Sequence, residues 1–309
     1  MTSLYVASFD KSGGIYHYEI NGKTIAKKQF VPLDSPMYLV ENGEKMYVLL
    51  REVNGKSAVV SFDIDKDGNL VNQSDPISTK GAVGCHLAVG GAKIYAAHYS
   101  SGSLFASPDL SLKLSDSSKM HFVGLTPDKK HLCICDLGLD KIYLFDKALA
   151  IKSEVKLKEG SGPRHICFDE AGEYAYCALE LSSEVASFSY SDGKLKLLGY
   201  VSATAGFDGE NYPAAIRILG DRLYVSNRGA DSVSVFSLCD GKAELVNSFS
   251  SRGKCPRDIF ILDDMLVCAN QDSNNVSVFK IKENEIKYIT EIKVKAPICV
   301  MLKREGRVQ

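Results

Sequence analysis

The chain has 309 residues and a formal net charge of −1, and 45% of its residues are hydrophobic and 24% charged. These values are ordinary for a soluble globular protein, and they leave neither a general basic field for nucleic acid nor a polybasic patch for a membrane. No apolar run reaches the about 18 residues that a transmembrane helix needs, and the N-terminus lacks the basic start and apolar centre of a signal peptide. We therefore expect a cytoplasmic protein without nucleic-acid or membrane partners.

Short apolar runs separated by turn residues follow one another along the whole chain. In chain order they form predicted strands at 4–7 and 15–20, a weak repeat unit from Ser35, clearer units at 84–110, 120–147, 162–190, 212–238 and 255–281, and a last run at 297–300. In the clearest unit, 162–190, two apolar runs flank the turn Asp169-Glu170-Ala171-Gly172, and a third run alternates with period two. The unit therefore predicts antiparallel β-strands.

The spacing of the units indicates the architecture. Their first strands begin near residues 36, 85, 120, 163, 213, 256 and 297, which lie 35 to 50 residues apart. Four strands repeated at a period of about 40–50 residues are typical of a β-propeller. The seventh unit is split between the two ends of the chain. The sequence thus predicts an all-β, seven-bladed propeller in one domain, residues 1–309, whose ring is closed by pairing of the N- and C-terminal strands.

Nine cysteines are present, without a C-x-x-C pair. Cys133 and Cys135 lie two residues apart on a predicted strand, so both point to one face, which suits packing better than chelation. Cysteine commonly behaves as a small buried hydrophobe. We expect reduced thiols in a cytosolic protein.

Polar residues recur at equivalent positions of the repeats. In a ring, such positions converge around the axis at one height. The residues that enter the first strands are Tyr38, His86, His121, His165, Ala215, Asp258 and Cys299, and Arg164 and Arg257 precede two of them. The residues just past the second strands are Phe9, Arg51, Tyr99, Leu137, Glu180, Arg228 and Gln271. A purely structural column would tend to repeat one residue type, so these mixed columns predict an active site.

Structural roles compete with this interpretation for each residue. A single histidine at a strand start, such as His86, is more often a hydrogen-bonded structural residue than a catalyst. Glu180 can pair with Arg164 or Arg228 as a structural ion pair, and Asp136 can cap the turn at Leu137-Gly138. Burying charges for structure alone is costly, however, so a charged cluster at the channel mouth favours a functional site.

The motifs in these repeats resemble those of one family. The runs GPRHICF with AYCALELSSEVASF, LYVSNRGADSVSVF and ANQDSNNVSVF are similar to the lactonase family of seven-bladed propellers, which includes bacterial 6-phosphogluconolactonases and the 3-carboxy-cis,cis-muconate lactonising enzyme. The resemblance covers essentially the whole chain. The sequence departs from the family pattern at Leu179, where asparagine is common, and at 117–120, where many members have a longer proline-rich run.

The resemblance implies a set of active-site positions. They fall on His121, Asp136, Arg164, His165, Glu180, Arg228 and Gln271, with His86 and Arg257 nearby. It also implies a hydrolase that opens an anionic sugar lactone without a cofactor.

The chemistry of these residues suits that reaction. Arginine binds phosphate or carboxylate bidentately, and we expect Arg164, Arg228 and Arg257 to hold the anionic group. We expect His165, oriented by Glu180, to activate water, with His121 and Asp136 as a second such pair. An arginine or His86 would stabilise the oxyanion. No G-x-S-x-G motif is present, which disfavours a covalent acyl-enzyme.

Several alternatives remain open. The same residues suit a cycloisomerase acting on a carboxylated muconate, and a non-catalytic propeller could instead bind a protein partner across its face. Three histidines with Asp136 resemble metal ligands, but we expect them to be too far apart, and we expect no metal. We expect a monomer or a weak homo-oligomer.

Overall fold

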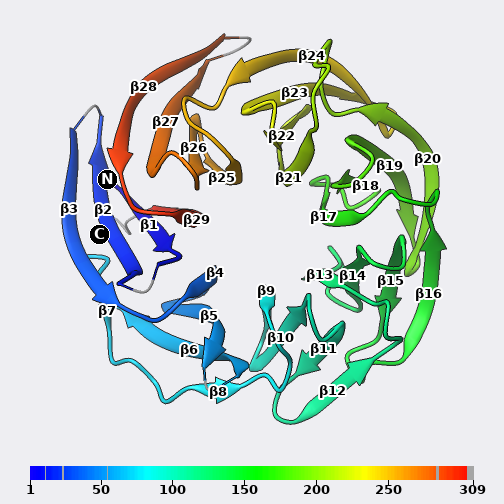
Figure 1. Ribbon diagram of the computed structural model, residues 1–309, viewed down its shortest axis with the longest axis horizontal. Coiled ribbons are helices and arrows are strands. Elements are labelled where there is room, and N and C mark those ends of the chain that lie inside the picture. Colours follow the sequence, from blue (N-terminus) through cyan, green and yellow to red (C-terminus); the bar gives the residue numbers. More distant parts are fainter. Residues whose placement is uncertain (11, 23, 54, 283–284, 305–309) are drawn as a thin grey trace.

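The computed structural model describes residues 1–304 except 11, 23, 54, 283 and 284. Within this part of the chain, β-strands form seven antiparallel sheets arranged as blades around a central channel (Figure 1). The prediction of an all-β seven-bladed propeller is confirmed. Among the described residues, no helix has the length and apolar character needed to cross a membrane.

Each blade begins with an inner strand beside the channel and continues outward. One contains β29 (Pro297–Arg304), β1 (Thr2–Ser8), β2 (Gly14–Asn21) and β3 (Thr24–Pro32). The next contains β4 (Pro36–Asn42), β5 (Lys45–Val53), β6 (Lys56–Ile64) and β7 (Leu70–Val71), and β8 (Ile77–Ser78) also pairs with β6. Then follow β9 (Gly84–Gly90), β10 (Lys93–His98), β11 (Ser103–Ala106) and β12 (Leu110–Lys113). The fourth has β13 (Met120–Leu125), β14 (Leu132–Asp136), β15 (Lys141–Phe145) and β16 (Ile151–Lys156).

The remaining three blades follow in chain order. The first of them contains β17 (Pro163–Phe168), β18 (Tyr174–Leu179), β19 (Glu184–Ser191) and β20 (Lys194–Ser202). The next contains β21 (Tyr212–Leu219), β22 (Arg222–Arg228), β23 (Ser232–Cys239) and β24 (Lys242–Ser250). The last contains β25 (Pro256–Leu262), β26 (Met265–Asn270), β27 (Asn275–Lys282) and β28 (Glu285–Lys293).

The ring is closed by strands from opposite ends of the chain. β29 pairs antiparallel with β1, from Thr2 opposite Arg304 to Ser8 opposite Pro297. In Figure 1 the red strand of the C-terminal region accordingly lies beside the blue strands of the N-terminal region. This pairing confirms the predicted split repeat.

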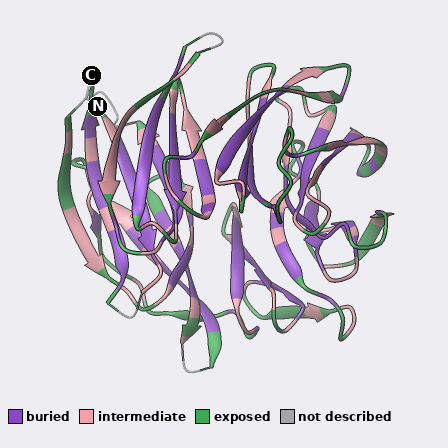
Figure 2. Ribbon diagram, turned by 45° about the horizontal axis from the view of Figure 1, so that its top comes forward, coloured by how far each residue is buried: buried purple, intermediate pink, exposed green. Residues whose placement is uncertain are grey.

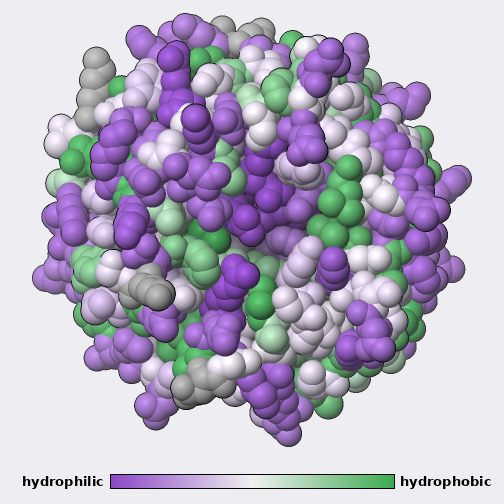
Figure 3. Space-filling model, in the orientation of Figure 1, coloured by the Kyte–Doolittle hydropathy of each residue, from purple (hydrophilic) through white to green (hydrophobic). Residues whose placement is uncertain are grey.

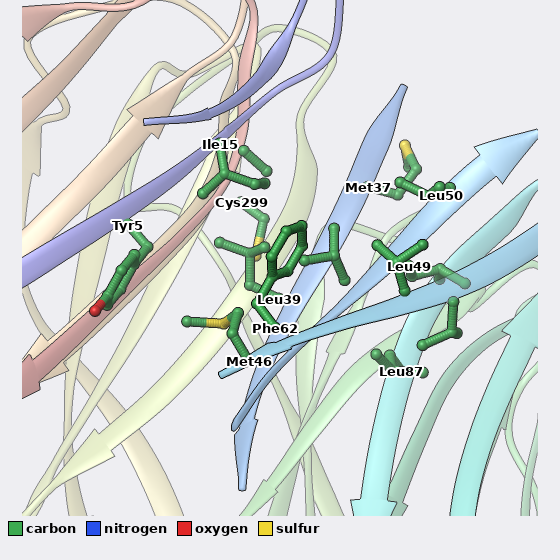
Figure 4. Close-up of a cluster of buried hydrophobic side chains, with 14 of the residues drawn as sticks. Tyr5, Ile15, Met37, Leu39, Met46, Leu49, Leu50, Phe62, Leu87 and Cys299 are labelled. Carbon is green, nitrogen blue, oxygen red and sulfur yellow. The ribbon is translucent and has the colours of Figure 1, made fainter. Parts of the chain in front are cut away.

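The hydrophobic core lies between neighbouring blades. Inner and middle strands are largely buried and the outer strands are partly exposed, as the colours of Figure 2 show. Figure 4 shows one cluster, in which Tyr5 and Ile15 of one blade meet Leu39 and Met46 of the next. The cysteines Cys133, Cys135 and Cys177 are part of another such cluster, in agreement with their predicted packing role.

A β-bulge recurs near the start of the inner strands. In β17, Pro163 lies opposite Leu179 and His165 opposite Ala178, so Arg164 is an extra residue. The extra residue breaks the alternation of side chains, which lets two successive residues face the channel. The same register shift occurs in five other inner strands, where the extra residues are Met37, Cys85, His121, Arg257 and Ile298. In β21 the register shift lies between Pro213 and Ile216.

The bulges correct one predicted column. His121 is the extra residue of β13, at the level of Arg164 and Arg257, whereas Phe122 occupies the position of His86 and His165. The prediction that all three histidines occupy one position is therefore wrong. A bulge adds a residue to one strand without a sequence signal, so counting from the strand start was off by one.

The closing strand offers a test of the fold. Leu302 in β29 is 3% exposed and packs with Leu4 and Val267. We expect Leu302→Ala to lower the free energy of unfolding by about 2–5 kcal/mol, since it removes buried methyl groups and leaves a cavity. Ile151→Ala, on the outer strand β16 where the side chain is 45% exposed, is the matched control. This substitution should change the free energy of unfolding by less than about 0.5 kcal/mol. Equal effects in urea unfolding would contradict the assigned closure.

Candidate active site

A small polar cavity lies where the bulged ends of the inner strands converge. It has a volume of about 20 Å³, room for roughly one water molecule. The cavity is lined by bulge residues and by some of the residues that directly follow them: Met37, Tyr38, Cys85, His121, Arg164, His165, Arg257, Asp258 and Ile298. Figure 3 shows hydrophilic side chains gathered in a hollow at the centre of the ring.

Arg164 is the most buried charge of this cavity, with 3% of its side chain exposed. Its Nη1 donates to the Ala214 carbonyl at 2.8 Å and lies 3.2 Å from His165 Nε2. Its Nε lies 2.9 Å from Glu180 Oε2. Burial lowers the pKa of Arg164 to about 9, with a further contribution from the charge of Arg228, and the guanidinium remains a cation at neutral pH. The bulge and these contacts fix the group in one orientation.

Glu180 bridges two arginines. Its Oε2 lies 2.9 Å from Arg164 Nε and 2.9 Å from Arg228 Nη2. Burial alone would raise the pKa of Glu180, but the charges of Arg164 and Arg228 outweigh it and hold the pKa below its usual value. The described structure has no hydrogen bond between Glu180 and His165, so the prediction that Glu180 orients His165 is wrong. Glu180 instead forms the ion pairs with Arg164 and Arg228 that the alternative interpretation predicted.

The cluster carries an excess of positive charge. Arg228 Nε also donates to the Tyr212 carbonyl at 3.1 Å. Arg257 has no carboxylate within 4.0 Å among the described residues, and burial and the charge of Arg228 lower its pKa. Three arginines against one glutamate leave a net charge of +2 in the cluster of Arg164, Glu180, Arg228 and Arg257. This charge is opposite in sign and similar in size to that of a dianion.

A second ion pair, which the sequence analysis missed, lies deeper in the channel. Arg217 Nη2 lies 3.1 Å from Asp258 Oδ1, and Asp258 also accepts from the Val300 N–H. Burial alone would lower the pKa of Arg217, but attraction to Asp258 raises it. Its charge is therefore compensated internally. An arginine flanked by Ile216 and Ile218 on an inner strand was the available sequence signal.

His121 and His165 face the polar cavity as neutral groups. Their ring centroids lie 5.4 Å apart, and Nδ1 of each is buried without a hydrogen-bond partner in the described structure. Burial lowers the pKa of both well below the ordinary value, and Arg164 lowers it further. Because Arg164 can only donate, His165 Nε2 accepts, which places the proton of the neutral ring on Nδ1.

His86 lies on the other side of His165, 5.0 Å away between ring centroids. It stacks between Tyr38 and Phe122 and does not line the polar cavity. No group of three or more His, Cys, Asp or Glu side chains in the described part of the chain is placed so that it could hold a metal ion.

Asp136 takes a structural position. Its carboxylate accepts from Ser118 Oγ and from the N–H groups of Lys119, Gly138 and Leu139. The predicted pairing of Asp136 with His121 is therefore wrong, and the turn-capping alternative is confirmed. The carboxylate fastens the segment before β13 to the end of β14.

Two further residues remain, of which only Cys85 lines the polar cavity. Gln271 follows β26 at the position of Glu180 after β18, and its Oε1 is buried without a hydrogen-bond partner among the described residues. Cys85 lines the polar cavity and was missed as a lining residue. Burial raises the pKa of its thiol to about 12, so it is no nucleophile at neutral pH.

Comparison with known proteins identifies the family. Residues 3–302 match the family described as lactonase, 7-bladed beta-propeller. The chain belongs to this family. An uncharacterised protein of Staphylococcus aureus strain USA300 is 31% identical over 293 residues, with 84% of this chain and 85% of that protein covered.

Solved structures agree. A protein from Lactobacillus plantarum is 26% identical, with a TM-score of 0.90, 98% of this chain covered and 100% of the other. A candidate 6-phosphogluconolactonase from Bacteroides fragilis is 26% identical, with a TM-score of 0.90 and 98% of both chains covered.

Replacing Asp136 separates a structural role from a catalytic one. We expect Asp136→Ala to lower the free energy of unfolding by about 2–4 kcal/mol, because one buried and three partly buried donors lose their acceptor. Asp116→Ala, which removes an exposed carboxylate, should change it by less than about 0.5 kcal/mol. Urea unfolding measures both. A stable Asp136→Ala protein would contradict the capping role.

The buried histidines predict acid sensitivity. His86, His98, His121 and His165 have pKa values lowered by burial, whereas in the unfolded chain they take up a proton below about pH 6.5. The unfolded state thus binds more protons as the pH falls, so stability is retained above about pH 6.5 and lost on acidification. Each histidine should contribute about 1.4 kcal/mol per pH unit. His86→Phe should reduce the slope by that amount in urea unfolding between about pH 6.5 and pH 5, and an unchanged slope would contradict its neutral state.

Proposed function

We propose that the protein hydrolyses a phosphorylated sugar lactone such as 6-phosphogluconolactone. The observation that carries the proposal is the net charge of +2 of the arginine–glutamate cluster beside two neutral histidines. A phosphate monoester carries a charge of about −1.5 to −2 at neutral pH, which matches this excess. The family, and the Bacteroides candidate 6-phosphogluconolactonases at 26% identity, support the same class of substrate.

The arginines have different parts in this proposal. Arg257, which has no carboxylate partner in the described structure, binds the phosphate, and the nearby charge of Arg228 assists it. Glu180 contacts both Arg228 and Arg164, and its negative charge offsets the repulsion between the two guanidinium groups. Arg164 in turn fixes the ring of His165.

The histidines provide the proton transfers. His165 donates from Nδ1 to the lactone carbonyl oxygen and stabilises the developing oxyanion. Neutral His121 accepts a proton from the attacking water through a ring nitrogen. Water adds to the carbonyl carbon, the ring C–O bond of the tetrahedral intermediate breaks, and the leaving alkoxide takes up the proton from His121. The product is the open hydroxy acid.

Two substrates distinguish phosphate binding from catalysis. We expect Arg257→Ala to lower kcat/KM by about 30- to 100-fold for freshly generated 6-phosphogluconolactone, because a charge-assisted contact is lost. For the unphosphorylated gluconolactone the change should be small. Arg252→Ala, an exposed arginine that stacks on Tyr288, is the matched control and should leave both rates unchanged.

The same assay tests the reaction itself. Hydrolysis should be resistant to a chelator and should collapse in a folded His121→Asn variant. No acceleration over spontaneous ring opening by the folded wild type would refute the proposed substrate. Equal losses on both lactones in Arg257→Ala would refute the phosphate contact.

A further inference from the structure

A second cavity, which we call the far cavity, opens on the other side of the channel. Its volume is about 520 Å³. The residues that line it continue along the inner strands away from the bulges, for example 39–41 of β4, 87–89 of β9 and 123–125 of β13. Only Tyr38 lines both this cavity and the polar one. The channel thus has two separate binding volumes.

A layer of rings divides the two cavities. The ring centroids of Tyr38 and His86 lie 4.0 Å apart, and those of His86 and Phe122 lie 4.3 Å apart. Phe122 and His165 follow at 5.8 Å. A Cβ on Gly124 would lie 2.7 Å from the Phe122 ring, so the glycine leaves the space that this ring occupies. The layer forms the floor of the far cavity.

The walls of the far cavity are mostly apolar, and its charges are compensated. Its lining includes Val40, Ala88, Leu125, Phe260 and Met301. The two charged residues among the lining each have a partner: Arg217 pairs with Asp258 at 3.1 Å, and Glu41 contacts Lys303 Nζ. No free counter-charge is therefore offered to an ion by the described lining. Moving an unpaired charge into such a site would be costly.

His86 supplies an unused hydrogen-bonding group at the floor. In the described structure neither ring nitrogen meets the geometry of a full hydrogen bond, and the ring has a weaker polar contact with the Val123 backbone. Burial lowers its pKa well below the ordinary value, Arg217 lowers it further, and only the Val123 backbone opposes the shift. The ring is therefore neutral, with one donor and one acceptor.

We propose that the far cavity binds a small uncharged molecule that has an apolar body and one hydroxyl or carbonyl group. The volume lies in the range of small-molecule sites, about 300–1,000 Å³, and such sites combine apolar walls with few polar groups. The apolar body packs against the walls, and the polar group bonds to His86. This site is independent of the proposed lactone hydrolysis.

Three probes of one shape test the charge preference: cyclohexanol, cyclohexanecarboxylate and cyclohexylammonium. We expect cyclohexanol to bind with a Kd of about 1–10 mM and to shift the methyl carbon resonance of Met301 in NMR titrations. The carboxylate and the ammonium should bind at least about tenfold more weakly. No saturable shift of Met301 with cyclohexanol, or equal binding of the charged probes, overturns the proposal.

Substitutions that fill the cavity test the location. Val40→Trp fills the far cavity and should abolish the shift, whereas Val246→Trp, on the exposed outer strand β24, should leave it unchanged. Leu125→Trp serves the same purpose if Val40→Trp does not fold. His86→Phe keeps a ring in the layer but should weaken cyclohexanol binding about tenfold. Undiminished binding in a folded cavity-filling variant overturns the site, and undiminished binding in His86→Phe overturns the role of His86.

Discussion

The bulge at the start of the inner strands is the constraint on which the site depends. In a regular strand, successive side chains point to opposite faces, so only every second residue would face the channel. The extra residue brings Arg164 and His165, and likewise Arg257 and Asp258, into the same lining. Bulges of this kind are common beside active sites because they redirect side chains. A narrow channel thereby gains a dense set of functional groups.

The close packing of charged and titratable side chains in the channel has an electrostatic consequence. Three arginines and two histidines would repel one another if all were charged. The repulsion is limited because Glu180 lies between Arg164 and Arg228, and because burial and the arginines keep His121 and His165 neutral. The histidines can then exchange protons with a substrate while the arginines retain their charge. In the proposed reaction, the arginines would therefore bind the anionic group and the histidines would transfer protons.

The architecture was largely predictable from the sequence, because turn residues and apolar runs repeat at a regular period and the split repeat implies closure. The gathering of His121, Arg164, His165 and Arg257 around one cavity was also predictable. The pairings of the site residues were not. A bulge has no sequence signal, so His121 was assigned to the wrong level. The partners of a side chain also depend on distances that the sequence does not show. Glu180 pairs with two arginines rather than with His165, and Asp136 accepts hydrogen bonds from nearby backbone N–H groups. The second cavity depends on which rings stack, which sequence alone does not reveal.

The closure of the ring by the C-terminal strand β29 has a consequence for folding during synthesis. β29 is the last strand of the described chain, yet it is the innermost strand of the blade that β1 and β2 begin. During synthesis the N-terminal strands therefore emerge long before their inner neighbour. Until then β1 presents an unpaired edge of backbone groups, which is the kind of surface that invites wrong pairing and aggregation. Completion of the ring is thus the step that protects the nascent protein.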